Sequence, residues 1–328
     1  MGSGIAGISA ANTLTLHGKE VLILDKARNS GGRLSTRRHP LFSFDHGAQF
    51  FTAKDTEFLQ IVQSGLNNSE ITTLTHPQKG KIYIGNPVFH PFVSRLKEQF
   101  HVEQNALVTQ INKSPDKPNE EWQISIEGRQ TIHAKNLILT MPAQQTEALL
   151  PNYLHALKKT ALQAEFLPCI AAMAGIEISA SDVTLVNPEN PELLPLLHES
   201  EVISWSIAKW SHNSAQDAAY LSVMIHANPQ YSERYLEQDA DISADKLWSE
   251  WLSSIPNSHN FNISALPTHI SYLKGHRWRY AKVSKVVNES HPFVDPSHSI
   301  ALAGDWLQGP RIESAWISGR NAALSLLS

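Results

Sequence analysis

Three glycines at the start of the chain have the spacing of a dinucleotide-binding turn. Gly2, Gly4 and Gly7 form a G-x-G-x-x-G pattern, and Asp25 stands 18 positions after Gly7. In such a turn, backbone N–H groups and the start of a helix hold a pyrophosphate, while the acid accepts hydrogen bonds from ribose hydroxyls. The alternative is a glycine-rich tail in front of an amphipathic helix. We predict dinucleotide binding.

The residues around the glycines predict the elements that position them. Residues 5–17 are typical of a helix with small residues in its early turns, and residues 20–25 form an apolar run typical of a buried parallel strand. A glycine turn of this type normally follows a strand, yet only Met1 precedes Gly2. We therefore expect residues 1–328 to be a shortened form that lacks an apolar first strand of about 5–6 residues.

A second candidate binding group lies near the end of the chain. Residues 299–304 are typical of a short buried strand, and Asp305 follows it directly. A carboxylate at this edge can accept hydrogen bonds from ligand hydroxyls, or it can cap a helix. Residues 312–327 have the pattern of a helix, in which Trp316 either lines a ligand or packs in the core.

Composition excludes several other classes of function. The 328 residues carry a net charge of −4, which provides no basic excess for nucleic acid or an anionic membrane. No apolar run approaches the roughly 18 residues of a membrane span. Cys169 is the only cysteine, which fits a reducing compartment and predicts a cytoplasmic protein. The 16 histidines show no metal-ligand spacing, so we expect no metal.

Five sequence segments closely resemble bacterial renalase-type flavoproteins of the flavin-containing amine oxidase superfamily. The most specific are FDHGAQFFTAKD at 44–55 and ALAGDWLQGPRIESAWISGRNAALSLL at 301–327. IGNPVFHPFVSRL, NLILTMPAQQ and GHRWRYA extend the resemblance to 84–96, 136–145 and 275–281. Residues 150–270 match only loosely, and within them the sequence predicts a helix near residues 232–255. Similar sequences commonly have glycine where this chain has Pro310 and Ser314. Because proline lacks an N–H group, flavin affinity or tuning can differ here.

The resemblance implies an α/β fold with a Rossmann-like FAD-binding domain and a second, mixed-sheet α+β substrate domain. We assign residues 1–65, 93–150 and 292–328 to the FAD-binding domain, and residues 66–92 and 151–291 to the substrate domain. FAD is expected to bind without a covalent link, and the resemblance implies that the first turn of the helix at 312–327 points at the flavin pyrimidine. The residues expected to bind it are Gly2, Gly4, Ile5, Ala6, Gly7, Asp25, Lys26, Gly31, Gly32, Arg33, Gly47, Ala48, Gln49, Val108, Thr140, Pro142, Gly304, Asp305, Arg311, Glu313, Ala315 and Trp316.

The substrate side of the predicted site centres on the HRWRY segment. In a strand, His276, Trp278 and Tyr280 point to one face, and the two arginines between them point to the other. We expect one set to contact substrate, and we choose His276 and Trp278 as the catalytic residues. His46, Phe51, Trp205 and Tyr280 complete the predicted substrate-binding set.

The resemblance implies a specific reaction. Renalase-type enzymes oxidise the 2- and 6-dihydro isomers of NAD(P)H to NAD(P)+ by hydride transfer to flavin N5, and oxygen then accepts the electrons to give hydrogen peroxide. The partners expected here are this small molecule and oxygen, with the protein a monomer or weak dimer. One alternative is an amine or polyamine oxidase. An alternative of another class is a non-catalytic fragment that does not retain FAD.

Overall fold

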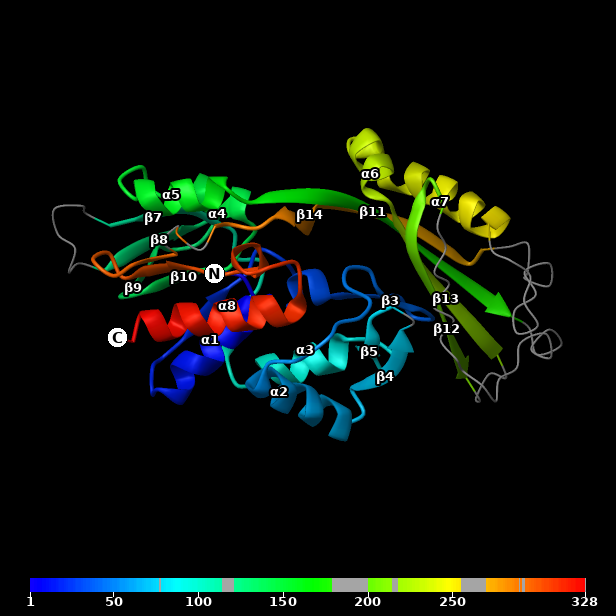
Figure 1. Ribbon diagram of the computed structural model, residues 1–328, viewed down its shortest axis with the longest axis horizontal. Coiled ribbons are helices and arrows are strands. Elements are labelled where there is room, and N and C mark those ends of the chain that lie inside the picture. The colour runs from blue at the N-terminus through cyan, green and yellow to red at the C-terminus, as the bar shows by residue number, and fades with distance from the viewer. Residues whose placement is uncertain are drawn as a thin grey trace. The chain divides into compact units, whose positions relative to one another are not determined.

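The computed structural model describes residues 1–76, 78–113, 121–178, 200–213, 218–254, 270–288, 290 and 293–327. The chain divides into two units (Figure 1). Unit 1 comprises Met1–Ser35, Phe50–Phe166 and Val283–Ser328, and unit 2 comprises Thr36–Gln49 and Leu167–Lys282. This division differs from the predicted functional domains, because residues 36–49 fall in unit 2 and residues 66–92 in unit 1. The functional domains stay a prediction.

Unit 1 contains most of the helices and short strands. Its helices are α1 (Ile5–Leu16), α2 (Thr56–Asn67), α3 (His90–Lys97), α4 (Ala143–Leu149), α5 (His155–Leu162) and α8 (Ile312–Ser325), with the short helices η1 (Gly32–Leu34) and η4 (Asp305–Leu307). Its strands are β1 (Leu22–Leu24), β4 (Ile71–His76), β5 (Gly80–Gly85), β6 (His101–Glu103), β7 (Val108–Asn112), β8 (Trp122–Ile126), β9 (Ile132–Ala134), β10 (Leu137–Leu139), β15 (Val294–Asp295) and β16 (Ile300–Leu302).

Two pairs of parallel strands in unit 1 lie next to the glycine turn. Strand β1 pairs in parallel with β6, and β10 pairs in parallel with β16. Backbone hydrogen bonds of Met1 and Gly2 reach both pairs. The N–H of Gly2 donates to Leu24 O over 2.7 Å, and Met1 O accepts the N–H of Thr140 over 2.9 Å. Antiparallel hairpins add β4–β5 and the three-stranded sheet β7–β8–β9.

Helices α1 and α8 pack closely within unit 1 (Figure 1). Residues 5–11 of α1 are all buried, because they are small or apolar on every side. A Cβ atom on Gly319 of α8 would overlap the carbonyl oxygen of Ala6, so only glycine permits this approach. The structure confirms the predicted helices at 5–17 and 312–327, which end slightly earlier than predicted, at Leu16 and Ser325. No helix in the described part of the chain has both the length and the apolar character needed to cross a membrane.

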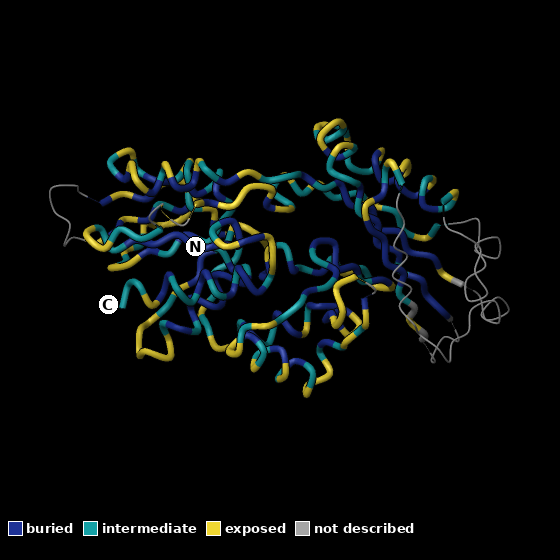
Figure 2. The backbone as a smooth tube through the Cα atoms, in the orientation of Figure 1, coloured by how far each residue is buried: buried dark blue, intermediate teal, exposed yellow. Residues whose placement is uncertain are grey.

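Unit 2 is built on a four-stranded sheet in the order β12–β13–β11–β14. Its strands are β2 (Thr36–Arg38), β3 (Ser43–Asp45), β11 (Glu165–Ile178), β12 (Ile203–Asn213), β13 (Ala218–Ala227) and β14 (Tyr272–Lys285), and its helices are α6 (Pro229–Tyr235) and α7 (Ala240–Ser254). Strands β11 and β14 each begin or end in unit 1. The inner strands carry long buried stretches, drawn dark blue in Figure 2.

The sequence predicts one helix near residues 232–255, and the structure confirms helix over most of this range but not its continuity. The structure has two helices there, because the chain makes a new helix start after α6 ends at Tyr235. The Asp239 carboxylate accepts the backbone N–H groups of Asp241 and Ile242 over 2.8 and 3.4 Å, which is the bonding of an N-cap residue. Residue 255 lies outside the described residues.

Candidate functional site

The glycine turn forms a tight loop between the first residues and α1. Gly2 has a φ of +100°, which L side chains rarely adopt, and a Cβ on Gly7 would overlap Gly2 O. Gly4 is the N-cap of α1, and a Cβ added to it would meet no atom within 4 Å. The turn therefore leaves open space at a helix N-terminus, where backbone N–H groups favour an anion.

A second glycine loop lies against the first. Gly31 forms a parallel bridge with Gly4, and its N–H donates to Ser3 O over 2.9 Å. A Cβ on Gly32 would meet Gly4 Cα at 3.4 Å. The two loops thus keep their backbones close together and leave room beside Gly4. A dinucleotide phosphate fits this cradle, because bulky side chains are missing on both of its walls.

The Asp25 carboxylate is oriented by the glycine turn itself. Its Oδ2 atom accepts hydrogen bonds from the backbone N–H and the hydroxyl of Ser3, each 2.6 Å long, and Oδ1 accepts the Ala27 N–H over 2.8 Å. Lys26 is exposed beside it. The sequence interpretation missed Ser3. The available signal was a small polar residue between the first two glycines of the motif.

Arg33 and Asp305 form a bidentate ion pair, although 272 residues separate them in the sequence. Arg33 Nη1 donates to Asp305 Oδ2 over 2.9 Å, and Nη2 donates to Oδ1 over 2.5 Å. The Asp305 side chain is 7% exposed and the Arg33 side chain is 28% exposed. Gly304, with a φ of +154°, leads into Asp305, and its N–H donates to Ser318 Oγ of α8 over 3.0 Å. The pair combines a carboxylate, which can accept hydrogen bonds, with a guanidinium, which can donate them to an anion.

The remaining predicted cofactor residues of unit 1 have varied surroundings. The Thr140 hydroxyl donates to Met1 O over 2.7 Å and to Gly2 O over 3.0 Å, and so supports the glycine turn. Pro142 is the N-cap of α4, and Val108 is the half-buried first residue of β7. Ile5 and Ala6 are buried in the first turn of α1.

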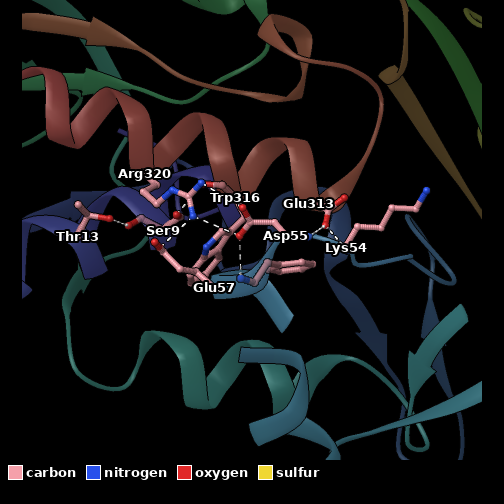
Figure 3. A network of polar contacts seen from close by, with 9 residues as sticks. Ser9, Thr13, Lys54, Asp55, Glu57, Glu313, Trp316 and Arg320 are labelled. Carbon is pink, nitrogen blue, oxygen red and sulfur yellow. Dashed lines mark hydrogen bonds and ion pairs between the residues drawn. The ribbon is translucent and has the colours of Figure 1, made fainter. Parts of the chain in front are cut away.

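The start of α8 is held by protein groups at several points (Figure 3). Arg311 is its exposed N-cap residue, and Ala315 is half-buried in the first turns. The buried Glu313 carboxylate accepts the backbone N–H groups of Lys54 and Asp55. Trp316 is 3% exposed, its ring lies 5.7 Å from that of Phe58, and its carbonyl accepts the Ser9 hydroxyl over 2.7 Å. Glu313 and Trp316 therefore contact protein at these atoms, and their contact with a cofactor stays a prediction.

Phe51, a predicted substrate residue, belongs to an aromatic cluster of unit 1. Its ring lies 5.4 Å from Tyr83, 5.7 Å from both Phe58 and Phe89, and 6.2 Å from Phe92. Phe51 is only 3% exposed, and its backbone pairs with Tyr83 in both directions. These contacts give Phe51 a packing role, while its role in substrate binding stays a prediction.

Within unit 2, the structure brings together His46, His276 and Trp278. The His46 ring centroid lies 4.7 Å from that of His276 and 5.2 Å from that of Trp278, and the last two are 4.5 Å apart. The Trp278 indole N–H donates to His46 O over 2.8 Å. The predicted alternation of β14 is confirmed, because Arg277 and Arg279 are exposed and bond to residues 236–238 instead.

A third imidazole, which the sequence interpretation missed, joins this cluster. His226 Nε2 lies 3.2 Å from His46 O and 3.5 Å from Gln49 Nε2. In the strand register His226 is paired with Trp205, another predicted substrate residue. No local signal in strand β13 distinguishes His226 from a packing residue. Gly47 and Gln49 are buried beside His46 in the chain, Ala48 is half-buried, and Tyr280 follows half-buried on β14.

All three imidazoles are neutral near pH 7. Burial, reinforced by the neighbouring His276, Arg37 and His226, lowers the pKa of His46 to about 3. Burial lowers the pKa of His226 to about 4, and burial with Arg37 and Arg277 lowers that of His276 to about 4. A neutral imidazole can donate or accept one hydrogen bond on each ring nitrogen without adding charge. The cluster is therefore suited to an uncharged planar ring.

A buried ion pair lies next to this cluster in the sequence. The Asp45 carboxylate accepts the Thr36 hydroxyl over 2.6 Å and pairs with Lys209 Nζ over 3.4 Å. Burial lowers the pKa of the Lys209 ammonium, while Asp45 opposes that shift. Among the residues that the structure describes, no group of three metal-binding side chains could hold an ion.

The comparisons with known proteins agree on the fold. Residues 1–64 match the NAD(P)-binding Rossmann-like domain family. The chain resembles cyclohexylamine oxidase from Brevibacterium oxydans IH-35A, with a TM-score of 0.66, 12% identity and coverage of 99% of this chain and 97% of the other. A putative protoporphyrinogen oxidase from Exiguobacterium sp. 255-15 gives a TM-score of 0.68 at 12% identity, again over 99% and 97%.

Putrescine oxidase bound to putrescine is a third similar structure, with a TM-score of 0.64, 12% identity and the same coverage of 99% and 97%. At this level of identity the likeness establishes the fold alone. The chain has an α/β fold with a Rossmann-like NAD(P)-binding domain, and the mixed sheets expected from the sequence are present.

Proposed function

We propose that this chain is an FAD-dependent oxidase of the renalase type, which oxidises 2- and 6-dihydro isomers of NAD(P)H and passes the electrons to oxygen. The observation that carries the proposal is the pair of glycine loops joined by Ser3, with open space beside Gly4. The sequence resemblance to renalase-type flavoproteins supplies the substrate class. The shared fold with three oxidases supports the broader class of oxidoreductase.

The residues of unit 1 are suited to hold FAD without a covalent link. Gly2, Gly4 and the start of α1 would bind the pyrophosphate, and Asp25 would accept ribose hydroxyls. Asp305 offers carboxylate oxygens to the ribityl hydroxyls, and Arg33 offers a cation to the phosphates. Bound FAD would supply a hydride acceptor at N5, which no side chain of the protein can provide.

The cluster of unit 2 is suited to the substrate ring. Trp278 offers an aromatic face whose orientation is fixed by its bond to His46 O. His46 and His276 add imidazoles that stay neutral at physiological pH, because burial lowers their pKa values to about 3 and about 4. A dihydropyridine is itself planar and uncharged, so this cluster would orient it without requiring a change of protonation in the protein.

An amine or polyamine oxidase is the second candidate. Two of the similar structures are named as oxidases of cyclohexylamine and putrescine, which favours an amine as substrate. Against it, an amine oxidase favours a cage of aromatic rings around a neutral amine, whereas the cluster of unit 2 combines one indole with imidazoles. A non-catalytic fragment is the candidate of another class. We further propose a cytoplasmic protein that acts as a monomer or weak dimer.

The first experiment asks whether the purified protein holds FAD. We expect a yellow protein with a flavin absorption band, and we expect denaturation to release FAD rather than FMN. Because no covalent link is proposed, all of the flavin should appear in the supernatant after acid precipitation. A colourless protein that takes up no FAD on reconstitution would contradict the proposal and favour the non-catalytic fragment.

A further inference from the structure

We infer that Glu313 is a positioning residue of the flavin site: it fixes the start of α8 to residues 54 and 55, and its charge lowers the flavin reduction potential. The inference rests on the proposed function, because it requires the N-terminus of α8 to face the flavin pyrimidine, as the sequence resemblance implies. The following contacts of unit 1 carry it (Figure 3).

Glu313 is a buried carboxylate in the first turn of α8. It is 6% exposed, and its Oε1 atom accepts the backbone N–H groups of both Lys54 and Asp55, the latter over 2.6 Å. Two N–H donors on one oxygen restrict the carboxylate to one orientation. The backbone of residues 54 and 55 is thereby attached to the helix end.

Arg320 holds the same segment from two turns further along α8. Its guanidinium nitrogens lie 3.2 Å from both oxygens of the Asp55 carboxylate and 2.9 Å from Glu57. Asp55 is also the N-cap of α2, where it accepts the Phe58 N–H over 3.0 Å. Asp55 is therefore bound through its N–H by Glu313 and through its side chain by Arg320.

Helix α8 is anchored on its other side as well. The Ser9 hydroxyl donates to Trp316 O over 2.7 Å, and Gly304 N–H donates to Ser318 Oγ over 3.0 Å. Gly319 lies too close to Ala6 O to accommodate a Cβ atom. With α8 fixed by α1 and by the residue before η4, the bonds of Glu313 determine where the 54–55 segment lies.

The charge of Glu313 has a separate electrical effect. A helix N-terminus carries a partial positive charge, and an acidic side chain in the first turn offsets it. The reduced flavin carries negative charge at N1–C2=O, so an uncompensated helix end would stabilise the reduced form. Glu313 thus opposes that stabilisation and lowers the potential, while its hydrogen bonds keep the helix end in place.

Three variants separate the charge from the attachment. Glu313→Gln keeps an oxygen of the same reach and removes the charge, whereas Glu313→Asp keeps the charge and shortens the reach. Glu57→Gln is the matched control, because this carboxylate belongs to the same network but its side chain is 65% exposed. The readouts are the flavin midpoint potential, measured by equilibration with redox dyes, and the melting temperature.

We expect the Glu313→Gln variant to retain FAD and to have a flavin midpoint potential about 30 mV higher than the parent. For a two-electron couple, this shift corresponds to a tenfold increase in the affinity for reduced FAD relative to oxidised FAD. Glu57→Gln should leave the potential unchanged, and Glu313→Asp should lower the melting temperature more than Glu313→Gln does. A Glu313→Gln enzyme with bound FAD and the parent potential would overturn the electrical role.

The attachment can be tested without any cofactor. In FAD-free protein, Glu313→Ala should lower the melting temperature by several degrees, and Glu57→Ala should not. If the parent binds no FAD, the proposed function fails, and with it the electrical role. Equal melting temperatures of Glu313→Ala and the parent would overturn the attachment, whatever the fate of the proposed function.

Discussion

The Asp25 carboxylate accepts two hydrogen bonds from Ser3, one from the backbone N–H and one from the hydroxyl, each 2.6 Å long. Ser3 O in turn accepts the N–H of Gly31. One fully buried serine therefore connects the glycine turn, the end of the acidic strand and the second glycine loop. The shape of the proposed phosphate cradle depends on this residue.

Replacing Ser3 with alanine tests that dependence. Ser3→Ala removes a hydrogen bond to a charged group, which typically contributes about 1.5–3 kcal/mol. We expect a lower melting temperature and at least tenfold weaker FAD binding, measured by fluorescence titration of FAD-free protein. Ser249→Ala is the control, because that serine is exposed on α7. Equal FAD affinity of Ser3→Ala and the parent would exclude a role for Ser3 in shaping the cradle.

Asp305→Ala should weaken FAD retention. The substitution removes the carboxylate proposed for the ribityl hydroxyls and releases Arg33 from its bidentate pair. Loss of a charge-assisted hydrogen bond of about 1.5–3 kcal/mol corresponds to a roughly tenfold to hundredfold loss of affinity. Flavin content after dialysis measures this loss of affinity. Asp245→Ala is the control, because the Asp245 side chain is exposed. If dialysed variant and parent hold equal flavin, the ribityl assignment is wrong.

Substitutions in the aromatic cluster should separate substrate contact from cofactor binding. We expect His276→Ala and Trp278→Ala to slow flavin reduction by dihydronicotinamide isomers at least tenfold while FAD stays bound. Trp278→Phe retains an aromatic face but loses the hydrogen bond to His46 O. Its rate of flavin reduction should therefore lie between those of the parent and Trp278→Ala. Stopped-flow absorbance at the flavin band gives the rates of flavin reduction. His133→Ala is the control, because His133 is exposed. Unchanged rates in both alanine variants would place the substrate site elsewhere.

The buried histidines predict a loss of stability in mild acid. Folded-state pKa values of about 3 for His46 and about 4 for His226 and His276 lie below the ordinary value of 6.5. Between pH 6.5 and about 4, the unfolded chain therefore binds more protons than the folded protein, so the free energy of unfolding decreases as pH falls. Each neutral histidine contributes a slope of up to about 1.4 kcal/mol per pH unit.

Urea unfolding at pH 7, 6 and 5 measures this slope. Acidic groups also titrate in this range, so the informative quantity is the difference between the parent and His46→Gln. We expect the variant to lose less stability between pH 7 and pH 5 than the parent does. Identical slopes for the two proteins would show that His46 is not buried in its neutral form.

The sequence predicted local elements better than long-range contacts. The helix of residues 5–16, the strand before Asp305 and the alternation of β14 follow from short-range patterns of apolar and polar residues, and the structure has all three. One helix was predicted near residues 232–255 where the structure has two, because the capping bonds of Asp239 were not considered. The glycine turn at residues 2–7 was recognised because its motif is contiguous in the sequence, and Gly31, Gly32 and Arg33 were assigned to FAD from the sequence resemblance.

Contacts between distant segments could not be predicted. Ser3 meets Asp25 across 22 residues, Thr140 meets Gly2 across 138, and His226 meets His46 across 180. Serine, threonine and histidine occur in many roles, and only the folded backbone brings these particular ones together. For the same reason the bonds of the Glu313 carboxylate to two backbone N–H groups could not be predicted, and its contact with a cofactor stays a prediction.

The most direct test of the proposed function is anaerobic reduction of the bound flavin. FAD-loaded protein is mixed, without oxygen, with 2- or 6-dihydro-NAD(P), with ordinary 4-dihydro-NAD(P)H, or with cyclohexylamine or putrescine. We predict rapid bleaching of the flavin band with the 2- and 6-dihydro isomers, formation of NAD(P)+, and hydrogen peroxide once air is admitted. Bleaching by the amines, with none by the 2- and 6-dihydro isomers, would contradict the proposal and make the chain an amine oxidase.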